Sequence, residues 1–143
     1  MMDEDATRNV IKLDLPATYK YLNVLGAVLT ALMERVEGIE ERNIVTYNLE
    51  LALHETCTNI VEHAYGGETG RINIVLTLEE QPRRLIVDLR DSGASFNLEQ
   101  APNPNLNQAQ ENGYGLFLMH QLVDEVTYIP QQGNNHWRLV KDL

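Results

Sequence analysis

The chain has 143 residues, carries a formal net charge of −10 at pH 7 and contains a single cysteine, Cys57. This length suits one domain built around a single core. The acidic excess argues against direct nucleic-acid binding, which draws most of its affinity from clustered Lys and Arg. A lone cysteine excludes an internal disulfide and a multi-cysteine zinc site, so we expect a reducing compartment and a thiol that packs in the core.

No stretch of the sequence resembles an export signal or a membrane span. Residues 1–8 are charged and polar, without the apolar segment of a signal peptide. No window approaches the roughly 20 apolar residues that a span requires. We therefore expect a cytoplasmic protein that binds no membrane, with residues 1–9 as an N-terminal tail and residues 10–143 as a single domain.

The first half of the domain is predicted as one strand followed by two helices. Apolar and polar residues alternate over residues 10–15, as in a half-buried strand, and Pro16 ends the pattern. Apolar residues at helical spacing then predict a helix over about residues 17–36. A second helix is expected over about residues 40–65, because Gly66 and Gly67 favour a stop there.

The second half is predicted as a hairpin, a long loop, a short helix and two strands. Alternating runs over residues 72–78 and 85–89 indicate the hairpin. Residues 92–112 show no apolar period, and a loop of that length is typically a functional lid or disordered. A helix over residues 116–123 and strands over 126–129 and 136–140 follow. This order predicts an α+β fold, a two-layer α/β sandwich whose mostly antiparallel sheet is covered on one face by three helices.

The first candidate motif is the polar stripe formed by Glu55, Asn59 and His63 on the second helix. Residues four apart lie on one helix face. Such a stripe usually faces solvent, but a carboxylate can also accept a proton and an Asn carbonyl can bind Mg²⁺ when phosphates supply the negative charge. His63 has two equal interpretations, a donor to a phosphate oxygen or a cap of the helix end.

The second motif is Asp91-Ser92-Gly93 at the end of a predicted strand. A carboxylate in this place can accept a hydrogen bond from an exocyclic amine such as that of adenine, and Gly93 would let a planar ring approach closely. Asp-x-Gly alone is more often a simple turn. Phe96 either packs under the base or fills the core.

The third motif is Gly113-Tyr114-Gly115, at the predicted junction of the long loop and the helix that follows it. Glycine lets the backbone bring its N–H groups against phosphates, and a helix that starts there adds the positive end of its dipole. The pattern is neither a Walker A loop nor a dinucleotide fingerprint, because the further residues of both are absent. A nucleotide site of this kind belongs to another architecture.

Together, in this order, the three motifs resemble the N, G1 and G2 boxes of the GHKL (HATPase_c) superfamily of ATPases and kinases. Within that superfamily the chain is similar to the anti-sigma-factor serine/threonine kinases of the RsbW type, over nearly its whole length. The resemblance implies a Bergerat ATP-binding fold with a mobile lid over about residues 92–112. It also implies ATP or ADP and Mg²⁺ as ligands.

The family implies a role for each matched residue. Glu55 would be the catalytic base that activates a serine of a protein substrate, and Asn59 would be the magnesium ligand. The residues that the resemblance assigns to the nucleotide are Asn59, His63, Asp91, Gly93, Phe96, Gly113, Tyr114, Gly115 and Leu116. The implied partners are a STAS-domain anti-anti-sigma protein, which is phosphorylated, and a sigma factor, which is sequestered. Such proteins commonly form homodimers.

The sequence departs from this family pattern at the lid. Some relatives carry an arginine two residues before the first G2 glycine, where this chain has Glu111, and residues 92–112 contain no Lys or Arg. Such an arginine can raise phosphoryl transfer by several powers of ten. A nucleotide-gated binding module with little kinase activity is therefore the alternative interpretation.

The sequence also departs from the family pattern at the start of the last predicted strand. Asn135-His136 stands where relatives often have threonine, so we leave the start of the last strand out of the adenine site.

Overall fold

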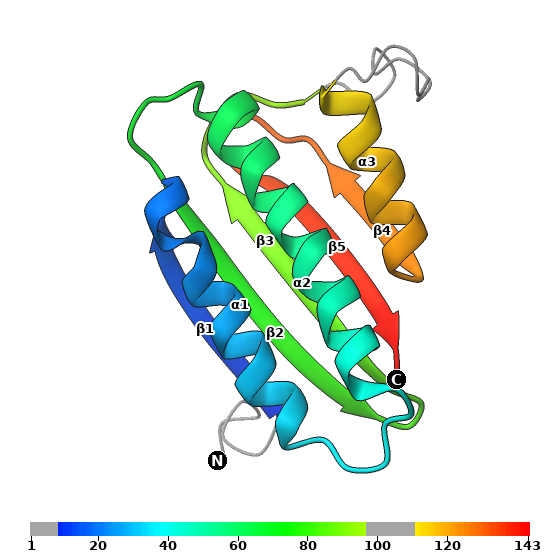
Figure 1. Cartoon of the computed structure of the whole chain (residues 1–143). Helices are drawn as coiled ribbons and strands as arrows, with labels where there is room; N and C mark the ends of the chain where they lie inside the picture. The colour runs from blue at the N-terminus through cyan, green and yellow to red at the C-terminus, as the bar shows by residue number, and fades with distance from the viewer. Residues whose placement is uncertain (1–8, 97–110) are drawn as a thin grey trace.

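A computed structural model describes residues 9–96 and 111–143, which form one five-stranded sheet and three α-helices. The helices all cover the same face of the sheet, so the architecture is the predicted two-layer α/β sandwich (Figure 1). Every pair of neighbouring strands is antiparallel, in the order β1-β2-β3-β5-β4. The predicted α+β class is thus confirmed.

The strands run slightly beyond their predicted bounds because the alternation of apolar residues continues into the ladder. They are β1 (Asn9–Pro16), β2 (Arg71–Glu80), β3 (Arg83–Asp91), β4 (Glu125–Ile129) and β5 (Asn135–Asp142). β1 therefore includes Asn9, which the sequence assigned to the tail. The turn before β5 contains Gly133 with a φ of 80°, which glycine adopts without strain.

The helices are α1 (Tyr19–Glu34), α2 (Arg42–Asn59) and α3 (Glu111–Leu122), and α2 continues into a π-helical turn, η2 (Ile60–Ala64). The first two helices fall within their predicted ranges. The third begins five residues earlier than predicted, since the sequence before Leu116 shows no apolar period. No helix within residues 9–96 and 111–143 has the length and apolarity to cross a membrane.

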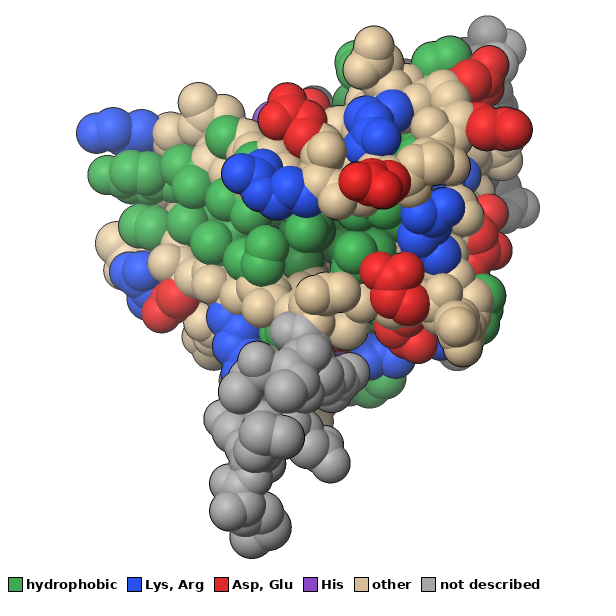
Figure 2. Space-filling model, turned by 90° about the horizontal axis from the view of Figure 1, so that it is seen from below, with side chains coloured by type: hydrophobic (Ala, Val, Ile, Leu, Met, Phe, Trp, Pro, Cys, Tyr) green, Lys and Arg blue, Asp and Glu red, His purple; other side chains and the backbone are tan. Residues whose placement is uncertain are grey.

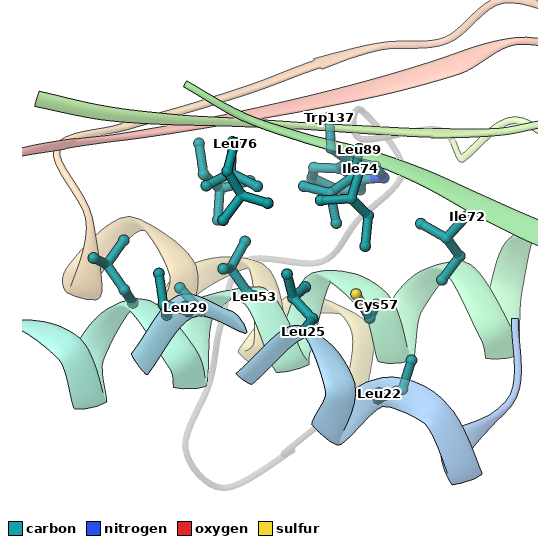
Figure 3. Close-up of a cluster of buried hydrophobic side chains, with 14 of the residues drawn as sticks. Leu22, Leu25, Leu29, Leu53, Cys57, Ile72, Ile74, Leu76, Leu89 and Trp137 are labelled. Carbon is teal, nitrogen blue, oxygen red and sulfur yellow. The ribbon is translucent and has the colours of Figure 1, made fainter. Parts of the chain in front are cut away.

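The core lies between the sheet and the helices. Leucine and isoleucine side chains of β2 and β3 meet those of α1 and α2 there, and Trp137 of β5 lies beside Leu89 and Ile74 (Figure 3). Cys57 lies in this layer with 1% of its surface exposed, and burial raises the pKa of its thiol to about 12. The thiol therefore packs as the sequence predicted.

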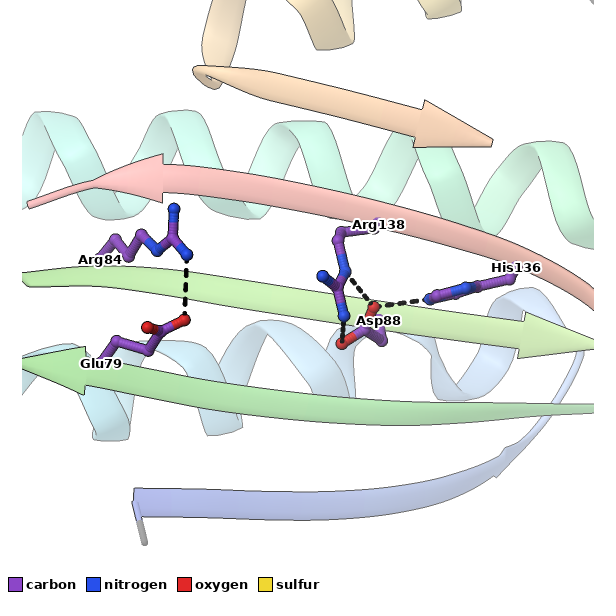
Figure 4. Close-up of polar contacts among 5 residues, drawn as sticks. All are labelled: Glu79, Arg84, Asp88, His136 and Arg138. Atoms are coloured by element: carbon purple, nitrogen blue, oxygen red, sulfur yellow. Dashed lines mark hydrogen bonds and ion pairs between the residues drawn. The ribbon is translucent and has the colours of Figure 1, made fainter. Parts of the chain in front are cut away.

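The other face of the sheet carries polar residues, as alternation requires. Asp88 accepts hydrogen bonds there from Arg138 at 2.8 Å and shares one of 2.6 Å with His136 (Figure 4). Arg84 and Glu79 form a second ion pair at 3.2 Å. These cross-strand pairs are partly exposed, so their contribution to stability is small.

The two ends of the molecule differ. The end of β3, the start of β5, the end of η2 and the start of α3 all lie at one end, the top in Figure 1. At the opposite end, apolar side chains gather into a surface patch with Lys and Arg side chains beside it (Figure 2). A groove of about 540 Å³ at that end lies between β1, the end of α1 and the end of β2.

Candidate functional site

The first and third motifs meet where α3 crosses α2. Glu55 is half-buried on α2, and Asn59, one turn later, is 7% exposed. A Cβ added to Gly115 would lie 3.0 Å from Oε2 of Glu55 and 3.9 Å from Nδ2 of Asn59. Glycine at position 115 therefore lets α3 come this close to the two polar side chains.

Within the described residues, neither the Glu55 carboxylate nor the Asn59 side-chain amide makes a hydrogen bond or an ion pair. Burying an amide without a partner costs free energy. A largely buried amide that the described residues leave without a partner is the kind of group that a ligand can satisfy.

The second motif meets the first through the end of the same helix. The N–H of Ala94 donates a 2.7 Å hydrogen bond to the carbonyl of Ala64, the last residue of η2. A Cβ added to Gly93 would lie 2.6 Å from the carbonyl carbon of Ala64. The approach of the helix end thus requires glycine at position 93, and the approach of a planar ring to Gly93 stays a prediction. Single π-turns of this kind are frequent at functional sites.

Tyr65 forms a second hydrogen-bonded connection between the end of η2 and the residues after Asp91. Its hydroxyl accepts the N–H of Ser92 at 3.0 Å and donates to the carbonyl of Arg71 at 2.6 Å. Its ring lies against Gly70, where any side chain would clash. The loop after β3 is therefore fixed to both η2 and the start of β2.

Asp91, the last residue of β3, is 5% exposed. Burial raises the pKa of its carboxyl above the ordinary aspartate value, while hydrogen bonds from Asn135 and Gly93 lower it in part. Both bonds go to the same oxygen, Oδ1, from the side-chain nitrogen of Asn135 at 3.0 Å and the N–H of Gly93 at 2.9 Å. The second oxygen receives no hydrogen bond from the described residues.

Asn135 is the residue that sequence reasoning missed. It is fully buried, lies opposite Asp91 in the register of β3 and β5, and uses both ends of its amide. The nitrogen also donates to the carbonyls of Gly93 at 3.0 Å and Ala94 at 3.3 Å. The available signal was a polar residue on the same strand face as Trp137 and Leu139, which are buried.

Asn135 also bonds through its oxygen. That atom accepts the N–H of Gln131 at 3.1 Å and the hydroxyl of Ser95 at 2.7 Å. The side chain therefore connects the β4–β5 turn, the end of β3 and the loop that follows β3. Leaving the start of the last strand out of the site was an omission, since this residue contacts Asp91 directly.

His63 and Phe96 lie side by side near these hydrogen bonds. Their ring centroids are 6.1 Å apart, and the N–H of Phe96 donates to the hydroxyl of Tyr128 at 2.7 Å. Nε2 of His63 is buried and has no hydrogen-bond partner in the described residues, and it lies 3.7 Å from a carboxylate oxygen of Glu62. The role of His63 as a donor to a phosphate oxygen therefore stays a prediction.

The glycines of the third motif are placed differently from the prediction. The sequence put them at the start of a helix, whereas α3 already begins at Glu111 and includes both Gly113 and Gly115. Leu116 is half-buried against the core. The side chains of Glu111 and Tyr114, and residues 97–110 of the predicted lid, lie outside the described residues.

The side-chain oxygens of Glu55 and Asn59 suit a magnesium ion that a nucleotide also binds better than a metal ion that protein side chains alone hold. The described residues contain no cluster of three or more His, Cys, Asp and Glu side chains with metal-binding geometry. Mg²⁺ usually takes one or two protein oxygens and completes its shell with water and phosphates. The amide of Asn59 and the carboxylate of Glu55, which the described residues leave unpaired, fit that pattern.

Comparison with known proteins gives consistent matches. Residues 15–141 match the family described as Histidine kinase-like ATPase domain. The chain is 30% identical over 131 residues to Serine-protein kinase RsbW of Bacillus mycoides, an alignment that covers 86% of this chain and 79% of that protein. For the protein of the same name from Bacillus cereus the identity is 32% with the same coverage.

Solved structures agree in fold. The structure of the RsbU and RsbW domains of a Mycobacterium tuberculosis protein superposes with a TM-score of 0.68 at 18% identity, over 94% of this chain and 32% of that chain. The histidine kinase domain of a blue-light activated kinase from Erythrobacter litoralis gives 0.58 at 16% identity, over 87% and 60%. This chain thus spans less than two thirds of either solved chain, and the likeness at these identities is one of fold.

Proposed function

The chain belongs to the Histidine kinase-like ATPase domain family, and from that membership we propose that it is an ATP-dependent serine protein kinase of the anti-sigma type. Its proposed substrate is a serine of a STAS-domain anti-anti-sigma protein, and its second partner is a sigma factor that it sequesters. We further propose that residues 10–143 act as one kinase domain and dimerise in the cytoplasm. The relatives named serine-protein kinase support the reaction class.

One observation carries the proposal, the meeting of Glu55, Asn59 and Gly115. A carboxylate and an amide, neither with a partner among the described residues, lie beside a glycine of α3. Phosphoryl transfer depends chiefly on positioning and on electrostatic stabilisation, so a base and a metal ligand held close together are parts that it requires.

The proposed reaction assigns one task to each residue. When bound, magnesium ATP supplies the γ-phosphoryl group and the cation that neutralises its charge. Glu55 accepts the proton of the substrate serine hydroxyl as the serine oxygen bonds to the γ-phosphorus and the bond to the β-phosphate oxygen breaks, with ADP leaving. Asn59 holds the metal through its side-chain oxygen. Asp91 binds the adenine amine at the end of β3.

The lid motivates a second candidate function. Residues 92–112 contain no Lys or Arg, so this chain supplies no lid cation to the transferring phosphate. A nucleotide-gated binding module would use the same nucleotide site to control partner capture, with little transfer. The kinase proposal is compatible with a lid that lacks Lys and Arg if transfer is slow. It is also compatible if the partner or a second subunit supplies a basic residue.

A transfer assay separates the two functions. The chain is incubated with γ-labelled ATP, Mg²⁺ and a STAS-domain anti-anti-sigma protein, and phosphoserine is located by mass spectrometry. The kinase proposal predicts labelled STAS serine with the wild type, a loss of about 10²–10⁴-fold with Glu55→Gln, and unchanged ADP affinity. Glu50→Gln is the matched control, since Glu50 is exposed on the same helix. Nucleotide-dependent partner capture without phosphoserine would favour the binding module.

A further inference from the structure

We propose that Asn135 is a positioning residue that makes Asp91 selective for a purine with an exocyclic amine. This inference rests on the proposed nucleotide site and adds a residue and a selection rule to it. The observations that carry it are the hydrogen-bond partners of the Asn135 amide and the single oxygen of Asp91 that they leave open.

The orientation of the Asn135 amide is fixed by its main-chain neighbours. The N–H of Gln131 can only donate, so the atom facing it at 3.1 Å must be the side-chain oxygen. The carbonyls of Gly93 and Ala94 can only accept, so the atom facing them must be the nitrogen. Asn135 is therefore a hydrogen-bond donor to Asp91, and the reverse orientation would remove the hydrogen bonds of three main-chain groups.

This donor leaves Asp91 with one available acceptor. Oδ1 is occupied by the Asn135 amide and by the N–H of Gly93, and Oδ2 has no partner among the described residues. An exocyclic amine placed at Oδ2 donates a hydrogen bond to it. An oxo group there would set two acceptors against each other, and a hydrogen atom would leave the buried oxygen unpaired.

Asn135 also preserves the chemical form that the amine requires. Burial favours the neutral carboxyl of Asp91, which would offer a proton in place of an acceptor, whereas the Asn135 hydrogen bond lowers the pKa of that carboxyl. Burial, and to a smaller extent the Asp91 charge, raises the pKa of Tyr128 of β4, whose hydroxyl accepts the N–H of Phe96. The Asn135 donor thus fixes both the direction and the charge of the acceptor.

The test compares two variants that differ in one hydroxyl group. Asn135→Thr keeps a donor near Oδ1 of Asp91, and Asn135→Val has nearly the same shape without it. For each protein the dissociation constants of ATP and of purine riboside triphosphate, which lacks only the 6-amino group, are measured by calorimetry. Their ratio cancels any general loosening of the site, which a merely structural role would cause.

The inference predicts that the wild type prefers ATP tenfold or more, about 1.4 kcal/mol. The preference should persist in part in Asn135→Thr and fall towards one in Asn135→Val. Equal ratios in the two folded variants would overturn the role of Asn135. If Asn135→Val does not fold, Asn135→Ser and Asn135→Ala give the same comparison.

Failure of the wider proposal would look different. A wild type that binds neither triphosphate would refute the nucleotide site itself. A wild type that binds both equally would leave a nucleotide site but refute the selection by Asp91 and Asn135.

Discussion

Gly115 of α3 lies so close to Glu55 of α2 that a methyl group on it would sit 3.0 Å from the carboxylate oxygen Oε2. Contacts this short force a neighbour to move. The Glu55 side chain is the flexible partner, so it would give way while the helices stay in place.

Gly115→Ala is therefore expected to impair phosphoryl transfer more than stability. Displacing the proposed base by a few tenths of an ångström should lower the transfer rate about tenfold or more, because positioning governs this chemistry. Alanine also favours helix over glycine, which offsets part of any strain. Phe117→Ala, at an exposed position two residues further along α3, is the control. Full transfer activity in Gly115→Ala would contradict the placement of Glu55 as base.

Asp91→Asn is expected to abolish nucleotide binding while stabilising the ligand-free protein at neutral pH. The pKa of Asp91 is raised in the folded state, so between the unfolded and folded pKa values the folded protein holds more protons and stability falls as pH rises. Above the folded pKa the buried charge carries its full cost, which asparagine lacks. Asparagine can still accept the hydrogen bonds from Gly93 and Asn135.

The stability advantage of Asp91→Asn should accordingly shrink as the pH falls through the raised pKa of Asp91. Thermal unfolding of both proteins without nucleotide, followed at several pH values from neutral to mildly acidic, measures this difference. A variant that is less stable than wild type by the same amount at every pH would show that the charge of Asp91 does not lower the stability of the folded protein.

Gly93→Ala is expected to destabilise the fold and the nucleotide site together. The added Cβ would lie 2.6 Å from the main-chain carbon of Ala64, and backbone cannot move aside as a flexible side chain can. A loss of about 1–3 kcal/mol in unfolding free energy, as for overpacked sites, should be seen in denaturant titration. Gly66→Asn is the control, since open space surrounds Gly66 and asparagine tolerates its φ of 58°. Equal stability of Gly93→Ala and wild type would exclude the tight approach of η2.

Much of the fold follows from local patterns in the sequence. The alternation of Ile72, Ile74 and Leu76 against polar neighbours specifies a strand with one buried face, and the structure places these residues in the core. The start of α3 was placed too late because glycines and polar residues at 111–115 carry no helical apolar period. Packing of Met119 against α2, through the Thr56 hydroxyl at 3.0 Å, supports the helix instead.

The site was less predictable than the fold. Glu55 and Asn59 could be paired from their spacing, because four residues make one helical turn. Asn135 could not be paired with Asp91 in this way. Their contact depends on the register of β3 and β5, and the two residues are 44 positions apart in the sequence. Gly93 was singled out for the approach of a planar ring, which stays a prediction, and the approach of the η2 end could not be foreseen because it is a tertiary contact.

The central claim is that Asn59, Asp91 and the start of α3 together bind a magnesium adenine nucleotide. Thermal unfolding with ADP, with and without Mg²⁺, tests it most directly. At 100 times the dissociation constant, ADP with Mg²⁺ should stabilise the wild type by about 2.7 kcal/mol. Asn59→Ala should lose the increment that Mg²⁺ adds. An unfolding curve of the wild type that ADP and Mg²⁺ leave unchanged would contradict the claim.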